Sequence, residues 1–276
     1  RAFDTATDLL PQAVDGDAAV RAAAMTALTQ LGGPEHIAGM VQGILAAERG
    51  RPREAAEKAV MLVCRRIEEP DQQTRPLLAA IDQLKEPDQI VVLPAVGRVG
   101  GSAALKMVKA AIADSDRKVH DAGLRALCNW PDASVAPELA QLVKTDPHAG
   151  DQTRALRALI RIAPLPDGRT DLEKLELLKS ALPLCARDEE RKLVLQRASA
   201  IRLPETLRFL MPYLAQPAFA EQACLSIVEL AHHRTLREPN KEEFHQALEK
   251  VKQTSSNATV IDRATRYQKG ETWVRQ

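Results

Sequence analysis

The chain has 276 residues, 45% of them hydrophobic and 27% charged, so it is long and apolar enough to bury a substantial core. Its formal net charge is +1, which excludes a global field that attracts nucleic acid or an anionic membrane. The longest apolar stretch, IVVLPAV at 90–96, is far shorter than the ~20 residues of a membrane-spanning helix, and we expect a soluble protein without membrane insertion.

Apolar residues at helical spacing, punctuated by Gly and Pro, predict helices along nearly the whole chain. The predicted helices are 17–31, 34–48, 53–67, 74–84, 88–99, 102–113, 117–129, 134–144, 151–163, 171–186, 188–202, 205–215, 218–232, 241–253 and 257–268. Their expected N-caps are Asp17, Asp88, Asp116, Ser134, Asp151 and Asp188. Pro94 is expected to interrupt the helix at 88–99. No alternating strand pattern competes, and the 3% aromatic content suits closely packed small helices.

One twelve-residue unit occurs twice. DAAVRAAAMTAL at 17–28 and DRKVHDAGLRAL at 116–127 share the Asp, the Val three residues later, a small residue at the eighth position and the closing Ala-Leu. The two copies are three periods of about 33 residues apart, a spacing typical of a helical solenoid. Helices with small residues on two faces fit between their own partner and the next pair, which is what stacking in one dimension requires.

This D-x-x-V-R-x-x-A-x-x-A-L unit resembles the HEAT-repeat family, particularly the bacterial HEAT-like arrays that include PBS-lyase-type proteins. The resemblance implies an all-α, right-handed α-α superhelix of about six to seven antiparallel helix pairs, with the second helices lining a concave side. It also implies a single array over 1–276, which we expect to be a segment of a larger protein. The family consists mainly of interaction platforms, and some members bind DNA or assist chromophore attachment.

His120 lies between Asp116 and Asp121 and is the residue that most resembles a catalytic or metal-binding site. It occupies the repeat position of Arg21, where the family has an arginine that pairs with an acid of a neighbouring repeat. Cys128 lies two turns away and about 80° around the helix, so the two side chains cannot bind one metal together. We therefore interpret His120 as structural.

Other motifs also have structural interpretations. GRVGGS at 97–102 lacks the GK[ST] of a phosphate-binding loop and is predicted to be a helix C-cap and turn, as is Gly32-Gly33. His232-His233 is predicted to end a helix before the loop RTLREPN, and ARDEERK at 186–192 to be a solvated first turn. Neither a metal-ligand cluster nor a nucleophilic triad can be singled out, so we expect no cofactor, no metal and no enzyme activity.

The cysteines Cys64, Cys128, Cys185 and Cys224 show no C-x-x-C spacing and lie in apolar helical patterns. We expect all four to be buried and reduced, which slightly favours the cytoplasm. An exported or periplasmic location stays open if the parent chain carries a signal.

One cluster of basic residues is the candidate binding surface. Its members are Arg154, Arg157, Arg161, Arg191, Lys192 and Arg197, and we call them the basic patch. The first three are spaced i, i+3, i+7 and share one helix face, which would suit an acidic peptide or a phosphate backbone. The structural alternative is pairing within the chain, to Asp146, Asp151, Asp188 and Glu189.

The sequence thus predicts a monomeric, non-catalytic scaffold that binds a protein partner, or another domain of its parent chain, on a concave helical surface. The alternative is a nucleic-acid-binding array that uses the basic patch, and the near-zero charge and scattered aromatic residues disfavour it. A third interpretation, a chromophore-lyase-like role, has no visible nucleophile to support it.

Overall fold

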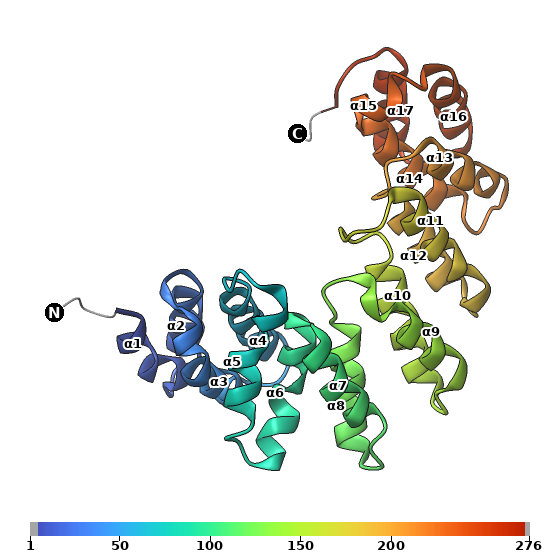
Figure 1. The fold of residues 1–276 in the computed structure, drawn as a ribbon. Helices are drawn as coiled ribbons and strands as arrows, with labels where there is room; N and C mark the ends of the chain where they lie inside the picture. Colours follow the sequence, from blue (N-terminus) through green and yellow to red (C-terminus); the bar gives the residue numbers. More distant parts are fainter. Residues whose placement is uncertain (1–4, 274–276) are drawn as a thin grey trace. The chain divides into compact units, whose positions relative to one another are not determined.

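The computed structural model describes residues 5–273, and every regular element in that range is a helix. The predicted all-α class is therefore confirmed. None of the helices in this range is both long and apolar enough to span a membrane. Contacts divide the chain into two compact units, Arg1–Pro131 and Asp132–Gln276, and the helices of each follow one another in chain order in Figure 1.

The first unit pairs neighbouring helices and stacks the pairs. Its helices are α1 (Thr5–Leu9), α2 (Ala18–Leu31), α3 (Ile37–Ala46), α4 (Arg51–Cys64), α5 (Arg75–Ile81), α6 (Glu86–Val99), α7 (Ser102–Ile112) and α8 (Arg117–Cys128). The 3₁₀ turns η1 (Pro11–Val14), η2 (Pro34–His36) and η3 (Pro70–Gln72) lie between them. Within this unit α2 contacts α4, α4 contacts α6 and α6 contacts α8, while α3 packs on α4 and α7 packs on α8.

The second unit repeats this arrangement. Its helices are α9 (Ala136–Thr145), α10 (Ala149–Ile162), α11 (Asp171–Ser180), α12 (Asp188–Ala198), α13 (Pro204–Leu210), α14 (Ala220–His232), α15 (Arg234–Arg237), α16 (Lys241–Thr254) and α17 (Ala258–Gln268). The 3₁₀ turns are η4 (Ala133–Val135), η5 (Leu182–Leu184) and η6 (Met211–Ala215). Here the second helices α10, α12 and α14 contact one another in turn, and α14 also contacts both helices of the final hairpin, α16 and α17.

Polar contacts between successive pairs recur at nearly the predicted repeat length. In the second unit Arg157 binds Glu190, Arg263 binds Glu229 and Arg208 binds Glu243, across 33, 34 and 35 residues. In the first unit the Arg66 guanidinium donates to the Gly32 carbonyl across 34 residues. These contacts join different parts of the helix pairs, but their shared sequence separation of 33 to 35 residues is the one that a helical repeat of that length gives.

Glycine brings two pairs of helices into backbone contact in the first unit. A Cβ at Gly97 on α6 would lie 1.9 Å from the Ala126 carbonyl oxygen of α8, and one at Gly123 would lie 2.8 Å from the Ile112 backbone nitrogen. The small residues that the repeat unit contributes therefore set how closely its helices approach.

The structure contains a buried acid on α4, Glu57, that was not predicted from the sequence. The Glu57 side chain is fully buried, accepts a hydrogen bond of 2.9 Å from Arg98 Nε on α6, and lies 3.7 Å from Arg125 Nη2 on α8. It therefore links three successive second helices. Its position inside the apolar run EAAEKAVMLV was the available signal, because an acid on a buried helix face needs a partner.

The helix ends differ from some expectations. Asp17 and Asp116 cap α2 and α8 through their carboxylates, as predicted. The other four expected caps are wrong, because the helices or turns begin earlier: Asp88, Asp151 and Asp188 lie in first turns, and Ser134 lies in η4, which Asp132 caps.

Pro94 does not interrupt its helix, because α6 runs through it from Glu86 to Val99. A proline inside a helix removes one backbone hydrogen bond and costs about 3 kcal/mol. The side chains around it, Val92, Leu93, Ala95 and Val96, are all buried, so core packing offsets that loss.

Candidate functional site

The basic patch lies on two second helices that pack together. Arg154, Arg157 and Arg161 belong to α10, Arg191, Lys192 and Arg197 belong to α12, and α10 contacts α12. Arg161 is half-buried and the other five are exposed. The sequence placed the two groups of basic residues on neighbouring helices, and the contact between α10 and α12 confirms this.

Arg157 is committed to a structural ion pair. Its Nε and Nη2 donate to Glu190 Oε1 at 3.1 and 3.0 Å, and Arg187 Nε donates to Glu190 Oε2 at 3.0 Å. Glu190 is only 1% exposed, so the interpretation of 186–192 as a fully solvated turn is wrong at this residue. The hydrogen bonds from Arg187, and then from Arg157, hold the pKa of the Glu190 carboxyl below its usual value.

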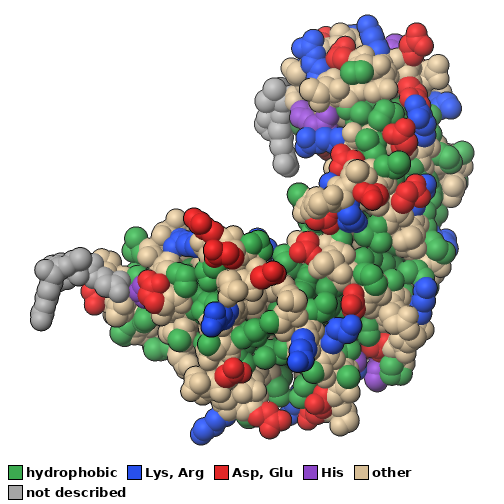
Figure 2. All heavy atoms as spheres, viewed as in Figure 1, with side chains coloured by type: hydrophobic (Ala, Val, Ile, Leu, Met, Phe, Trp, Pro, Cys, Tyr) green, Lys and Arg blue, Asp and Glu red, His purple; other side chains and the backbone are tan. Residues whose placement is uncertain are grey.

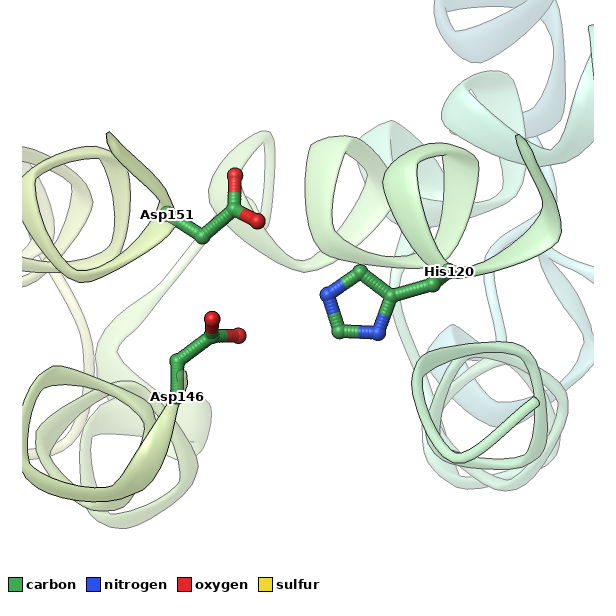
Figure 3. Close-up of side chains that lie close together, drawn as sticks. All are labelled: His120, Asp146 and Asp151. Carbon is green, nitrogen blue, oxygen red and sulfur yellow. The ribbon is translucent and has the colours of Figure 1, made fainter. Parts of the chain in front are cut away.

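Arg154 faces the acidic turn between α9 and α10. Its Nη1 lies 3.4 Å from Asp151 Oδ1. Asp151 and Asp146 are both buried, and one carboxylate oxygen of each lies within 4.8 Å of the other. Figure 3 shows both carboxylates, together with His120, which belongs to the first unit.

The turn itself carries three ligand groups for a divalent cation: the carboxylates of Asp146 and Asp151 and the imidazole of His148. Within the second unit, however, the Asp146 carboxylate accepts the His148 backbone N–H at 2.9 Å, and His148 Nδ1 lies 3.5 Å from the same oxygen. Together with the Arg154 contact to Asp151, these interactions give the turn a structural role in joining α9 to α10.

Two members of the basic patch, Lys192 and Arg197, form no ion pair with any residue in 5–273. Both are exposed. Arg191, by contrast, lies 3.6 Å from Asp188 Oδ1 and donates to the Cys185 carbonyl at 3.4 Å. Pairing within the chain thus engages Arg154 and Arg191 with two of the predicted acids, Asp151 and Asp188. Arg157 pairs with Glu190, which was not among the predicted acids. On the face that Figure 2 shows, acidic and basic side chains are interspersed.

The glycine motifs are turns. Gly100 ends α6 at φ 83° and Gly101 precedes α7 at φ 95°, a conformation that favours glycine. The Thr74 hydroxyl donates to the Gly100 carbonyl, so the turn is also fixed by a side chain. Gly32 and Gly33 also join two helices, but at negative φ, so their left-handed freedom is not used. At Gly32 the absence of a side chain matters, because a Cβ there would lie 2.7 Å from the Leu28 carbonyl oxygen.

The histidines singled out from the sequence have protein partners. His120 Nδ1 lies 2.7 Å from the Ile112 carbonyl oxygen of α7, and His232 Nδ1 lies 2.9 Å from the Tyr267 hydroxyl. α14 ends at His232 as predicted, but the following segment is not all loop, because Arg234–Arg237 forms α15. Burial and the nearby Arg202 lower the pKa of His233, which disfavours a charged imidazolium at this helix end.

All four cysteines are free thiols, and Cys64, Cys185 and Cys224 are buried as predicted, whereas Cys128 is only half-buried. Burial raises the pKa of the Cys64 thiol to about 12, that of Cys185 to about 11 and that of Cys224 to about 12. Thiols with raised pKa values are poor nucleophiles and poor metal ligands. These three residues are therefore packing residues.

The first unit carries an open groove between α2 and α4. It has a volume of about 260 Å³ and is lined mainly by small side chains. Arg21, Glu48 and Lys58 are its charged residues, and Arg21 pairs with Glu48 across it. That contact is the pairing expected of Arg21 with an acid of the next repeat.

No family model matches the chain, and no curated protein matches it. Among solved structures, a crystal structure described as an engineered protein is 16% identical, with coverage of 96% of this chain and 77% of that chain and a TM-score of 0.41. The class of the protein therefore rests on its own helices, which define an all-α, helical-repeat fold.

Proposed function

We propose that the chain is a non-catalytic, HEAT-like interaction module that binds a protein partner, or another domain of its parent chain, through its second helices. The observation that carries this proposal is the way in which buried glutamates fix these helices. Glu57 joins α4, α6 and α8, and Glu190 joins α10 and α12. A surface that is already ordered by its own scaffold loses little entropy when it binds.

The contact surface of the second unit is proposed to centre on Lys192 and Arg197. These two bases are exposed, whereas Arg157 is engaged by the buried Glu190. Because Lys192 and Arg197 make no ion pair within residues 5–273, their positive charges are available to attract an acidic partner.

The proposal is tested by affinity capture from the native host with the double variant Lys192→Glu/Arg197→Glu. Lys250→Glu is the matched control, because Lys250 is exposed on α16, away from α10 and α12. Partners that the unmodified chain and the control retain should be lost by the double variant. Equal capture by all three would remove this surface from the proposal.

Arg157 is unsuitable for this test. The variant Arg157→Glu would place a second carboxylate against the buried Glu190 and weaken the fold itself. Loss of capture by that variant would not distinguish binding from folding.

The nucleic-acid alternative makes a different prediction. Binding through the basic patch would give a gel shift at low salt that weakens steeply as salt rises. A shift that the double Lys192/Arg197 variant abolishes would replace the protein-partner proposal with this one.

A further inference from the structure

A small cavity near the C-terminal end of the second unit lies among α15, α16 and α17. Its volume is about 80 Å³. Since one water needs only ~10–15 Å³ of such space, the cavity has room for a cluster of waters or one small polyatomic group. Its lining residues are Arg237, Glu238, Lys241, Phe244, His245, Leu248, Tyr267, Gln268, Lys269 and Gly270.

A buried guanidinium forms part of the cavity wall. Arg237 is 3% exposed, donates from Nη1 to the Ala231 carbonyl at 2.6 Å, and lies 5.1 Å from the centre of the Tyr267 ring. The carbonyl contact lets this cation stabilise the C-terminal end of α14, which is its structural role.

The charge of Arg237 is only partly neutralised by the protein. Among residues 5–273 its carboxylate contact is with Glu238, at 3.4 Å, and the Glu238 side chain is 41% exposed. The same carboxylate oxygen also lies 3.9 Å from Arg234 Nε. A guanidinium offers five N–H donors, and a buried one is costly unless opposite charge compensates it.

The rim of the cavity adds more positive charge. Lys241 and Lys269 line it, are exposed, and make no ion pair within residues 5–273. His245 also lines the rim, and Glu238 is the acid there. The floor is apolar, because Phe244, Leu248 and Tyr267 are each at most 2% exposed.

We propose that this cavity binds one small oxyanion, a phosphate or carboxylate group, between Arg237, Lys241 and Lys269. The guanidinium supplies directional hydrogen bonds and the two lysines supply flexible point charges. The apolar floor limits the water that competes for the anion. This inference does not depend on the proposed interaction surface, which lies on α10 and α12.

The proposal is tested by titrating the full chain with inorganic phosphate at neutral pH and constant ionic strength, followed by two-dimensional amide NMR. Saturable shifts at residues of α15, α16 and α17 are expected, with a dissociation constant on the order of 1 mM. Acetate in a parallel titration distinguishes the carboxylate source from the phosphate source. The anion that saturates at lower concentration identifies the preferred group.

Variants that keep the fold decide whether the cavity is the site. Lys241→Gln/Lys269→Gln changes two exposed residues and should weaken phosphate binding roughly tenfold, which corresponds to about 1.4 kcal/mol. Lys250→Gln, on the same helix but outside the cavity, should leave binding unchanged. Absence of saturation with either anion, or equal binding by the double variant and the control, would overturn the proposal.

Discussion

The two units pack their helices together with different types of residue. In the first, Gly97 lets α6 touch the backbone of α8, whereas in the second the helix glycine Gly150 has nothing within 4 Å of the place where its Cβ would be. Aromatic side chains also concentrate in the second unit, where Tyr213 stacks edge-on against Phe209 and Phe219. Close backbone approach spaces the helices of one unit, and larger side chains fill the other.

A second comparison concerns the buried acids. Glu57 and Glu190 are both buried on second helices and both bind arginine, but Arg98 is 13% exposed whereas Arg157 and Arg187 are about half exposed. Because solvent screens exposed charges, losing the acid should matter more in the first unit. A buried glutamate paired with arginine is therefore expected to contribute more to the stability of the first unit than to that of the second.

Glycine substitution should give the largest difference between the units. Gly97→Ala places a Cβ against the Ala126 carbonyl, which no side-chain rotation can relieve, and should lower the free energy of unfolding of the first unit by about 3 kcal/mol. Gly150→Ala is the matched control and should be neutral or stabilising by up to about 1 kcal/mol, since alanine is the better helix former.

Urea unfolding measures both effects. Helical circular dichroism follows both units, and in a Trp273→Phe background the fluorescence of Trp130, which is 1% exposed, follows the first unit alone. Equal unfolding midpoints for the Gly97 and Gly150 variants would contradict the close approach of α6 and α8.

The next effect in size is expected at Glu57. Glu57→Gln keeps the shape of the side chain but leaves Arg98 without its carboxylate, and should destabilise the first unit by about 2–3 kcal/mol. Adding Arg98→Met should recover part of this loss, because the double variant no longer leaves a poorly solvated charge. Additive losses in the double-mutant cycle would show that the two side chains do not interact.

Glu190→Gln should have a smaller effect, about 1 kcal/mol at neutral pH, because Arg157 and Arg187 regain water when the carboxylate is removed. The pKa of Glu190 is lowered in the folded protein, mainly by the hydrogen bonds from Arg187 and then from Arg157. Its contribution is therefore present above the unfolded pKa of about 4.3 and is lost as the pH falls through the lower folded pKa.

Urea titrations of Glu190→Gln and the unmodified chain across pH 7 to 3 check this dependence. Glu189→Gln is the control, since Glu189 is exposed beside Glu190. A stability difference that grows on acidification would mean that the ion pairs of Glu190 do not stabilise the fold.

Local signals in the sequence were sufficient to predict the longer helices, although the short helices α1 and α15 were not predicted. Caps such as Asp17 and Asp116 act within three residues, and the apolar spacing of the repeat unit acts within a few turns. The continuity of α6 through Pro94 was not predictable in this way, because it depends on the burial of the side chains around the proline.

The candidate site shows the same limit. The sequence placed Arg154, Arg157 and Arg161 on one face, but whether each charge is available depends on its partners in space. Glu190 lies 33 residues from Arg157, and nothing local distinguishes it from the exposed Glu189. A charge pattern therefore predicts which residues share a face, whereas the folded neighbours decide which of them can bind a ligand.

The smallest effect is expected at an exposed pair of the second unit. Arg208 donates to Glu243 at 2.6 Å across 35 residues, close to the 33 residues between Arg157 and the buried Glu190, but the two side chains are 57% and 37% exposed. Solvent screening and the entropy of ordering long side chains offset the attraction, so Arg208→Ala should leave the urea midpoint unchanged within error. A clear decrease would mean that repeat spacing, more than burial, determines the strength of these contacts, and the comparison of Glu57 with Glu190 would then need the same revision.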